Sequence, residues 1–186
     1  MKNITMDYQQ GRHLKLAYLA GLIDGEGSIT ITVRVFKKKQ YSWAGLAPTL
    51  RITNTDYHLL SVAKEYIREI IGTDRKIKRN GNKRENRKQG FRILVNKRSD
   101  LEKLLKELLP YLILKKENAR ILLDYFDSHR YYEKTKMSDI EFLKRIQKLH
   151  DRGIYSNRGV KEMSLQRLYA DLSKRDDIVH HLEKSN

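Results

Sequence analysis

Residues 16–28 read Leu-Ala-Tyr-Leu-Ala-Gly-Leu-Ile-Asp-Gly-Glu-Gly-Ser. The first part, from Leu16 to Ile23, consists mainly of leucine, alanine and isoleucine, and this composition predicts a helix. Gly25 and Gly27 come next. We expect them to close the helix, because glycine is the residue found most often just beyond a helix C-terminus.

Two acidic side chains, Asp24 and Glu26, therefore lie at the C-terminus of the predicted helix. Unpaired carbonyl oxygens and the negative end of the helix dipole make this position unfavourable for carboxylates. A positive group is expected to join them. A divalent cation is the natural candidate, because hard cations bind carboxylate and carbonyl oxygens together.

The composition is that of a folded protein without disulfides. The chain has 186 residues, of which 39% are hydrophobic and 33% are charged, and it contains no cysteine. The absence of cysteine excludes a disulfide framework, a cysteine zinc site and a thiol nucleophile. No apolar run reaches the roughly 18 residues of a membrane span, and no secretion signal is recognisable. We therefore expect an intracellular protein with no membrane partner, folded as one domain over residues 1–186.

Basic residues are unevenly distributed along the chain. The net charge is +16, and residues 75–98 contain eleven Lys or Arg against one acid, whereas residues 124–186 contain thirteen against eleven. A concentrated positive field favours a polyanionic partner such as nucleic acid. A solvated lysine-rich surface is the simpler alternative, but it does not explain why the charge is concentrated in one stretch.

The apolar pattern changes period several times and predicts an α+β fold. Residues 28–35 and 46–53 alternate as half-buried strands do, and 36–44 form a basic hairpin tip. Pro48 favours an edge or bulged position for the second strand. Helical spacing covers 55–71, two more strands are expected at about 75–80 and 91–96, and Ser99 with Glu102 forms a capping box for the next helix. Helices are also expected at about 117–132, 139–150 and 164–183.

The resulting order is α-β-β-α-β-β-α with a helical C-terminal extension at about residues 121–186. Antiparallel hairpins with helices on one face give a curved four-stranded sheet whose other face is open. Such a face reads base edges in the major groove of DNA, although an ordinary solvated sheet face is the alternative. The expected DNA-binding residues are basic or carry a hydroxyl group: Thr30, Thr32, Arg34, Lys38, Thr49, Arg51, Lys76, Lys78 and Arg92.

The string Leu-Ala-Gly-Leu-Ile-Asp-Gly-Glu-Gly at residues 19–27 closely resembles the signature of the LAGLIDADG homing endonucleases. The resemblance includes the order of helices and strands, and it covers about residues 12–120. Only one copy of the signature is present, and family members with one copy are homodimers. The resemblance therefore implies a homodimer in which two signature helices pack closely, with the interface at Ala17, Ala20, Gly21 and Asp24. From the residues alone, packing of Ala17 and Gly21 against the chain's own sheet is an equal alternative.

The resemblance also implies the chemistry. Glu26 and the carbonyl of Gly25 would bind Mg²⁺ or another divalent cation such as Mn²⁺, and Asp24 would support the site without being a primary ligand. Lys115, and less specifically Asn54 and His58, match family positions that order solvent and stabilise charge at the scissile phosphate. Asn54 as a helix cap, His58 as a surface histidine and Lys115 as a phosphate contact are the alternatives.

The implied function is a site-specific, intron-encoded homing endonuclease that makes a metal-dependent double-strand break in a long, roughly palindromic target. Two alternatives keep the same fold: an RNA-binding intron maturase and a non-cleaving DNA-binding regulator. The retention of Glu26 between two glycines favours cleavage, because a protein that only binds phosphates has no need of a carboxylate near them.

Overall fold

The structure is a computed structural model that describes residues 2–38, 41–81, 88–129, 135–150 and 166–173. The chain groups into two compact units. The first unit contains residues 1–30 and 49–123, and the second contains residues 31–48 and 124–186.

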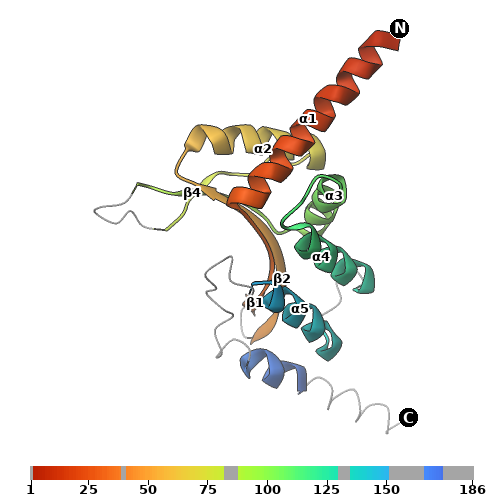
Figure 1. The fold of residues 1–186 in the computed structure, drawn as a ribbon. Helices are drawn as coiled ribbons and strands as arrows, with labels where there is room; N and C mark the ends of the chain where they lie inside the picture. Colours follow the sequence, from red (N-terminus) through yellow and green to blue (C-terminus); the bar gives the residue numbers. More distant parts are fainter. Residues whose placement is uncertain (1, 39–40, 82–87, 130–134, 151–165, 174–186) are drawn as a thin grey trace. The chain divides into compact units, whose positions relative to one another are not determined.

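The order of elements confirms the predicted α-β-β-α-β-β-α sequence and its helical extension (Figure 1). The elements are α1 (Lys2–Glu26), β1 (Gly27–Lys38), β2 (Tyr41–Asn54), α2 (Tyr57–Ile71), β3 (Lys78–Arg79), β4 (Phe91–Val95), α3 (Arg98–Leu108), α4 (Lys116–Ser128), the 3-10 turn Met137–Asp139 and α5 (Ile140–His150). Residues 166–173 are also helical.

The four strands form one sheet in the order β1-β2-β4-β3, and β4 is antiparallel to both β2 and β3. Of the two positions predicted from Pro48, the edge strand is wrong, because β2 lies between β1 and β4, and the bulge stays a prediction. The pairing of β2 with β4 covers Leu50 to Asn54. Pro48 therefore precedes that paired segment, where its missing N–H group would have disrupted the ladder.

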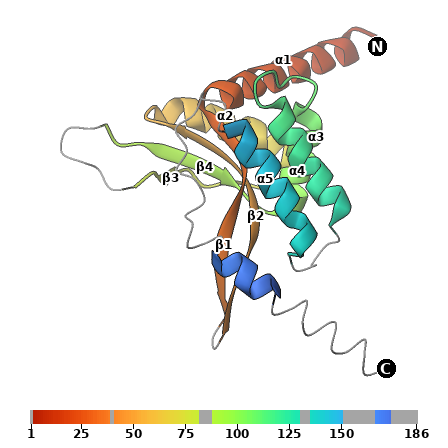
Figure 2. The same ribbon diagram turned by 60° about the horizontal axis from the view of Figure 1, so that its bottom comes forward.

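The core of the first unit lies between the sheet and α1, α2 and α3. Leu50, Ile52, Ile93 and Val95 are fully buried, and the register pairs Ile52 with Ile93 and Leu50 with Val95. Helix α2 contacts β4, and α1, α2 and α3 contact one another. Figure 2 shows these three helices together on one side of β3 and β4. One sheet face is thus apolar and covered, as the alternating pattern predicts.

Helix α2 begins and ends where local chemistry requires. The carboxylate of Asp56 accepts hydrogen bonds from the amides of His58 and Leu59, which makes Asp56 the N-cap. Gly72 ends the helix with φ of 76°, a left-handed conformation that glycine adopts without strain. Asn54, considered as a cap, instead accepts a hydrogen bond from the amide of Asp56 at 2.8 Å.

Helix α1 is longer than predicted at both ends. It begins at Lys2 instead of Leu16 and continues through Gly25 to Glu26. The glycine that ends it is Gly27, where a Cβ atom would lie 2.6 Å from the carbonyl oxygen of Ile23. The chain turns so sharply from helix into strand at this point that no larger residue fits without a shift.

Two local predictions in the second ββα half are also wrong. Strand β3 contains two residues, not about six. The preceding residues bond to helices instead of to a strand, as in the ion pair of Asp74 with Lys64. Ser99 does not cap α3, because its hydroxyl group donates to Asp100; Glu102 instead bonds Lys106 one turn later.

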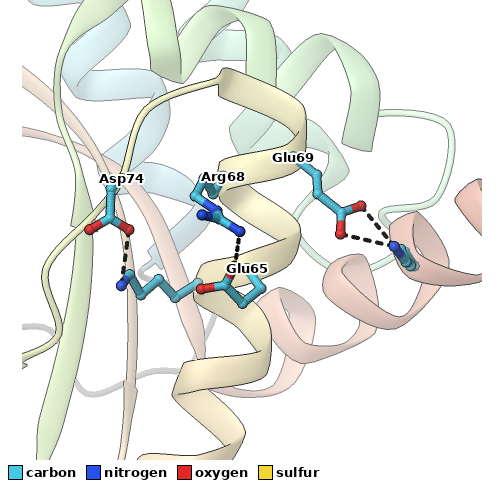
Figure 3. Close-up of polar contacts among 6 residues, drawn as sticks. Glu65, Arg68, Glu69 and Asp74 are labelled. Atoms are coloured by element: carbon cyan, nitrogen blue, oxygen red, sulfur yellow. Dashed lines mark hydrogen bonds and ion pairs between the residues drawn. The ribbon is translucent and has the colours of Figure 1, made fainter.

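Ion pairs lie on the exposed side of α2, as Figure 3 shows. Lys15 of α1 contacts both carboxylate oxygens of Glu69, at 2.9 and 2.8 Å. Arg68 bonds Glu65 within α2 at 2.6 Å. Each of these side chains is substantially exposed, so each pair adds at most about 1 kcal/mol to stability.

The second unit has its own buried cluster. His129 and Asp139 form a buried pair at 3.2 Å, and the ring of Tyr125 stacks on His129 at 5.1 Å. Phe142 of α5 lies edge-on to Tyr125. Across the described ranges, no helix is both long and apolar enough to cross a membrane.

Candidate active site and nucleic-acid interface

Asp24 is held inside the chain's own fold. It is 8% exposed, and its carboxylate accepts three backbone hydrogen bonds from residues 113–115, at 2.7, 3.1 and 2.9 Å. These amides immediately precede α4, so the negative carboxylate lies at the positive end of that helix dipole. The unfavourable position that the sequence assigned to Asp24 is thus relieved by protein groups.

Lys115 lies against the same end of α1. It is 6% exposed, and its ammonium group donates to the backbone carbonyl of Asp24. That carbonyl belongs to the last turn of α1, where carbonyl oxygens have no partner within the helix. The side chain of Lys115 is therefore fixed beside the end of the signature, and its predicted role at the scissile phosphate stays a prediction. The two residues are 91 positions apart in sequence.

Glu26 and Gly25, unlike Asp24, face solvent. Both are exposed at the C-terminal end of α1. The carboxylate and a helix-terminal carbonyl are hard oxygen donors, which fits a divalent cation such as Mg²⁺. In the part of the chain that the structure describes, no group of three or more His, Asp or Glu residues is arranged to hold a metal ion. Additional oxygen ligands would have to come from water, DNA phosphates or a second copy of the chain.

One face of α1 is apolar and partly exposed, although Tyr18 lies edge-on to Tyr66 of α2. Leu14 and Tyr18 are 69% and 47% exposed. Ala17, Gly21 and Gly25 lie on the same exposed face, and a Cβ atom at either glycine would meet nothing within 4 Å. Leu14 and Tyr18 were missed in the sequence, although positions 14, 18, 21 and 25 follow the spacing of a helix stripe.

Two of the four predicted interface residues are not on this face. Ala20 is fully buried and Asp24 is bonded to residues 113–115 of the same chain. The prediction is wrong for both, because a helix turn places them on the side that faces the chain's own core. Ala17 and Gly21 stay candidates for contact with a second copy.

The register places basic side chains next to one another across the sheet. Arg92 of β4 is opposite Thr53 of β2 and Lys78 of β3. Like charges directly opposite each other destabilise a strand pair. A polyanion bound over this face would offset that repulsion.

A cavity lies on the same side of the first unit. Predicted residues Lys76, Lys78 and Arg92 line it, so the structure brings these three together although Lys76 precedes β3. The other lining residues are Asp74, Arg75, Leu94 and Asn96. Arg75 was not identified from the sequence, since nothing in its spacing distinguishes it from its basic neighbours.

A buried carboxylate orients Arg75. Its guanidinium group bonds Asp100, which also accepts a hydrogen bond from Thr73 at 2.9 Å. Burial raises the pKa of Asp100, but hydrogen bonds from Thr73 and Ser99 and the charges of Arg75 and Lys97 outweigh it. The net pKa lies below its ordinary value, so the pair is ionised at neutral pH.

The remaining predicted DNA-binding residues fall into three groups. Thr30, Thr32, Arg34 and Arg51 are half-buried, and the hydroxyl group of Thr32 donates to the carbonyl of Ala47. Thr49 is 1% exposed, so its predicted contact with DNA is wrong. Lys38 ends β1, but its side chain lies outside the described residues.

Asn54 and His58 make their described hydrogen bonds locally. Asn54 accepts from the amide of Asp56, and the amide of His58 donates to the Asp56 carboxylate. The ring of His58 is exposed. Their role in cleavage stays a prediction.

Comparison with known proteins gives a family match and a fold. Residues 13–109 match the family described as LAGLIDADG-like domain. The fold is similar to that of the homing endonuclease I-CvuI in complex with a DNA target in the presence of Mg, with 19% identity, a TM-score of 0.58, and coverage of 88% of this chain and 97% of that one. It is also similar to the archaeal intron-encoded homing endonuclease I-Vdi141I complexed with DNA, with 20% identity, a TM-score of 0.56, and coverage of 88% and 98%. No curated protein matches the sequence.

Proposed function

The chain belongs to the LAGLIDADG family, and we propose that it is a homodimeric, divalent-metal-dependent endonuclease that cuts both strands of a long DNA target. The observation that carries the proposal is the contrast at the end of α1. Asp24 is fully engaged by its own chain, whereas Glu26 and Gly25 present oxygen donors to solvent.

The exposed face of α1 supports the dimer. Two copies joined through Ala17, Tyr18 and Gly21 would bring both Glu26 carboxylates to the symmetry axis. The absence of side chains at Gly21 and Gly25 leaves room for close approach of two helices. Each copy would then face one strand of the duplex, which accounts for a break in both strands.

Glu26 and the carbonyl of Gly25 would hold the cation. When bound, the cation polarises the scissile phosphate and lowers the pKa of an attacking water. Lys115 keeps a positive charge beside the same helix end, where it offsets the helix dipole and stabilises negative charge that develops at the phosphate. Asn54 and His58 are proposed to order solvent near the same phosphate.

The sheet face supplies target recognition. Arg51 and Arg92 are proposed to read base edges, while Lys76 and Lys78 contact the phosphate backbone near them. The exposed Glu26 supports cleavage over the maturase and regulator alternatives, since an unneutralised carboxylate weakens binding to phosphates.

The test uses duplex DNA of the genomic locus from which the coding sequence of this chain has been removed. The purified chain is incubated with it in Mg²⁺ or in EDTA, and the cut ends on both strands are mapped. Sedimentation of the chain with this DNA gives the stoichiometry. Cutting of both strands only with Mg²⁺ by two copies is expected. Metal-independent cutting, or a single copy on the site, would overturn the proposal, and binding to intron RNA without cutting would support the maturase.

A further inference from the structure

Two backbone amides of β2 are bonded to side chains from the C-terminal part of the chain. The amide of Ala44 donates to the carboxylate of Asp171 at 2.6 Å, and the amide of Leu46 donates to the hydroxyl group of Thr135 at 3.0 Å. All four residues belong to the second unit. Amides two residues apart point toward the same edge of a strand, so both side chains act as acceptors along one edge of β2.

The amides of Ala44 and Leu46 need acceptors because the pairing of β2 with β4 ends before it reaches them. The β2–β4 ladder covers Leu50 to Asn54 and stops there on the way to the hairpin tip. Ala44 and Leu46 lie beyond it and are buried, and a buried amide requires a partner. Asp171 and Thr135 therefore continue the bonding of β2 where β4 does not reach.

The segment that carries Asp171 is itself anchored. Leu168 and Leu172 are 0% and 2% exposed and lie one helical turn apart within helical residues 166–173. Asp171 is adjacent to Leu172. Its carboxylate is thus presented from a packed element, which makes it a fixed point for the strand that it bonds.

We infer that Asp171 is a positioning residue that sets the orientation of the β1–β2 hairpin. Because β1 leads from Gly27, next to the proposed cleavage centre at Glu26, toward the hairpin tip, Asp171 thereby sets the specificity for the outer base pairs of each half-site. The inference rests on the proposed function, because the hairpin carries the candidate DNA contacts Thr32 and Arg34. Thr135 holds the next amide along the same edge. The C-terminal extension, which lies outside the family match at residues 13–109, thus has a role in target recognition.

The first experiment measures hydrogen exchange of individual amides in the full chain. Asp171→Ala removes the acceptor, Asp171→Asn keeps one acceptor oxygen, and Asp127→Asn, at an exposed position of α4, is the control for charge. Asp171→Ala is expected to speed exchange at Ala44 by about tenfold and to leave the paired amides of residues 50–54 unchanged. Asp171→Asn and Asp127→Asn are expected to stay near wild type. Unchanged exchange at Ala44 in Asp171→Ala would overturn the inference.

The second experiment measures cleavage of the cognate site and of variants with one base pair changed at a time. Asp171→Ala is expected to lose about tenfold in discrimination at outer pairs and nothing at inner pairs. A uniform loss at every position would show a merely structural role and overturn the inference. If the wild-type chain neither binds nor cuts DNA, both the proposed function and the role of Asp171 in target specificity fail. The hydrogen exchange at Ala44 still decides whether Asp171 holds the hairpin.

Discussion

The two faces of α1 have opposite surroundings. The inner face contains Leu19, Ala20 and Ile23, all fully buried, and Asp24, which bonds residues 113–115. The outer face contains Leu14 and Tyr18, large side chains that are 69% and 47% exposed. The inner residues of the signature therefore hold the fold together, whereas Gly21, Gly25 and Glu26 stay exposed, and these are the residues through which we propose contact with a second copy and a cation.

The largest effect is expected for a substitution of Glu26, at the exposed C-terminal end of α1. Glu26→Gln should reduce metal-dependent cleavage by at least about 100-fold, because a neutral amide is a poor ligand for a hard cation. Binding to the duplex and the midpoint of urea unfolding should not change, since Glu26 is exposed. Glu141→Gln, an exposed site on α5, is the matched control. Cleavage at the wild-type rate by Glu26→Gln would remove Glu26 from the metal site.

The covered face is tested by Asp24→Ala. The change leaves up to three backbone amides without their acceptor. We expect a loss of about 3 kcal/mol in the free energy of unfolding, measured in urea. Asp127→Ala, at an exposed position of α4, should change the free energy of unfolding by less than about 0.5 kcal/mol. An equally small effect of Asp24→Ala would contradict the division of α1 into two faces.

Gly27 and Gly21 allow the same comparison with one kind of substitution, because one is enclosed and the other is exposed. Gly27→Ala should destabilise the chain by about 1–3 kcal/mol, because the new Cβ would lie 2.6 Å from a backbone oxygen. Gly21→Ala should stabilise the isolated chain by up to about 1 kcal/mol, because its Cβ meets nothing. Gly21→Ala should nevertheless weaken self-association, measured by sedimentation. Unchanged association would exclude Gly21 from the dimer interface.

The smallest effect on stability is expected for the exposed ion pair between Lys15 of α1 and Glu69 of α2. Lys15→Ala removes the ion pair with Glu69, whose side chains are 43% and 51% exposed. The free energy of unfolding should fall by less than about 1 kcal/mol, and the difference should shrink further in high salt. A loss as large as that of Asp24→Ala would show that this exposed ion pair, and not the buried face, holds α1 in place.

Much of the fold follows from local patterns in the sequence. The alternation of Ile29 and Ile31 with threonine predicted β1, and the helical spacing of residues 55–71 predicted α2. The short β3 was not predictable, because Arg75, at the start of the predicted strand, bonds Asp100 of α3 instead. The same limit applies to Thr49, which the alternation of its strand places on the open sheet face but which is 1% exposed.

The sequence by itself determined the order of elements, the basic character of one region and the signature with its two acids, because helix periodicity, strand alternation and charge are local properties. Only the tertiary structure decided that Asp24 and Glu26 differ. Residues 113–115 reach Asp24 from 89 to 91 positions away and saturate its carboxylate. The direction in which each side chain points, and which distant amide meets it, depends on packing that no local pattern contains.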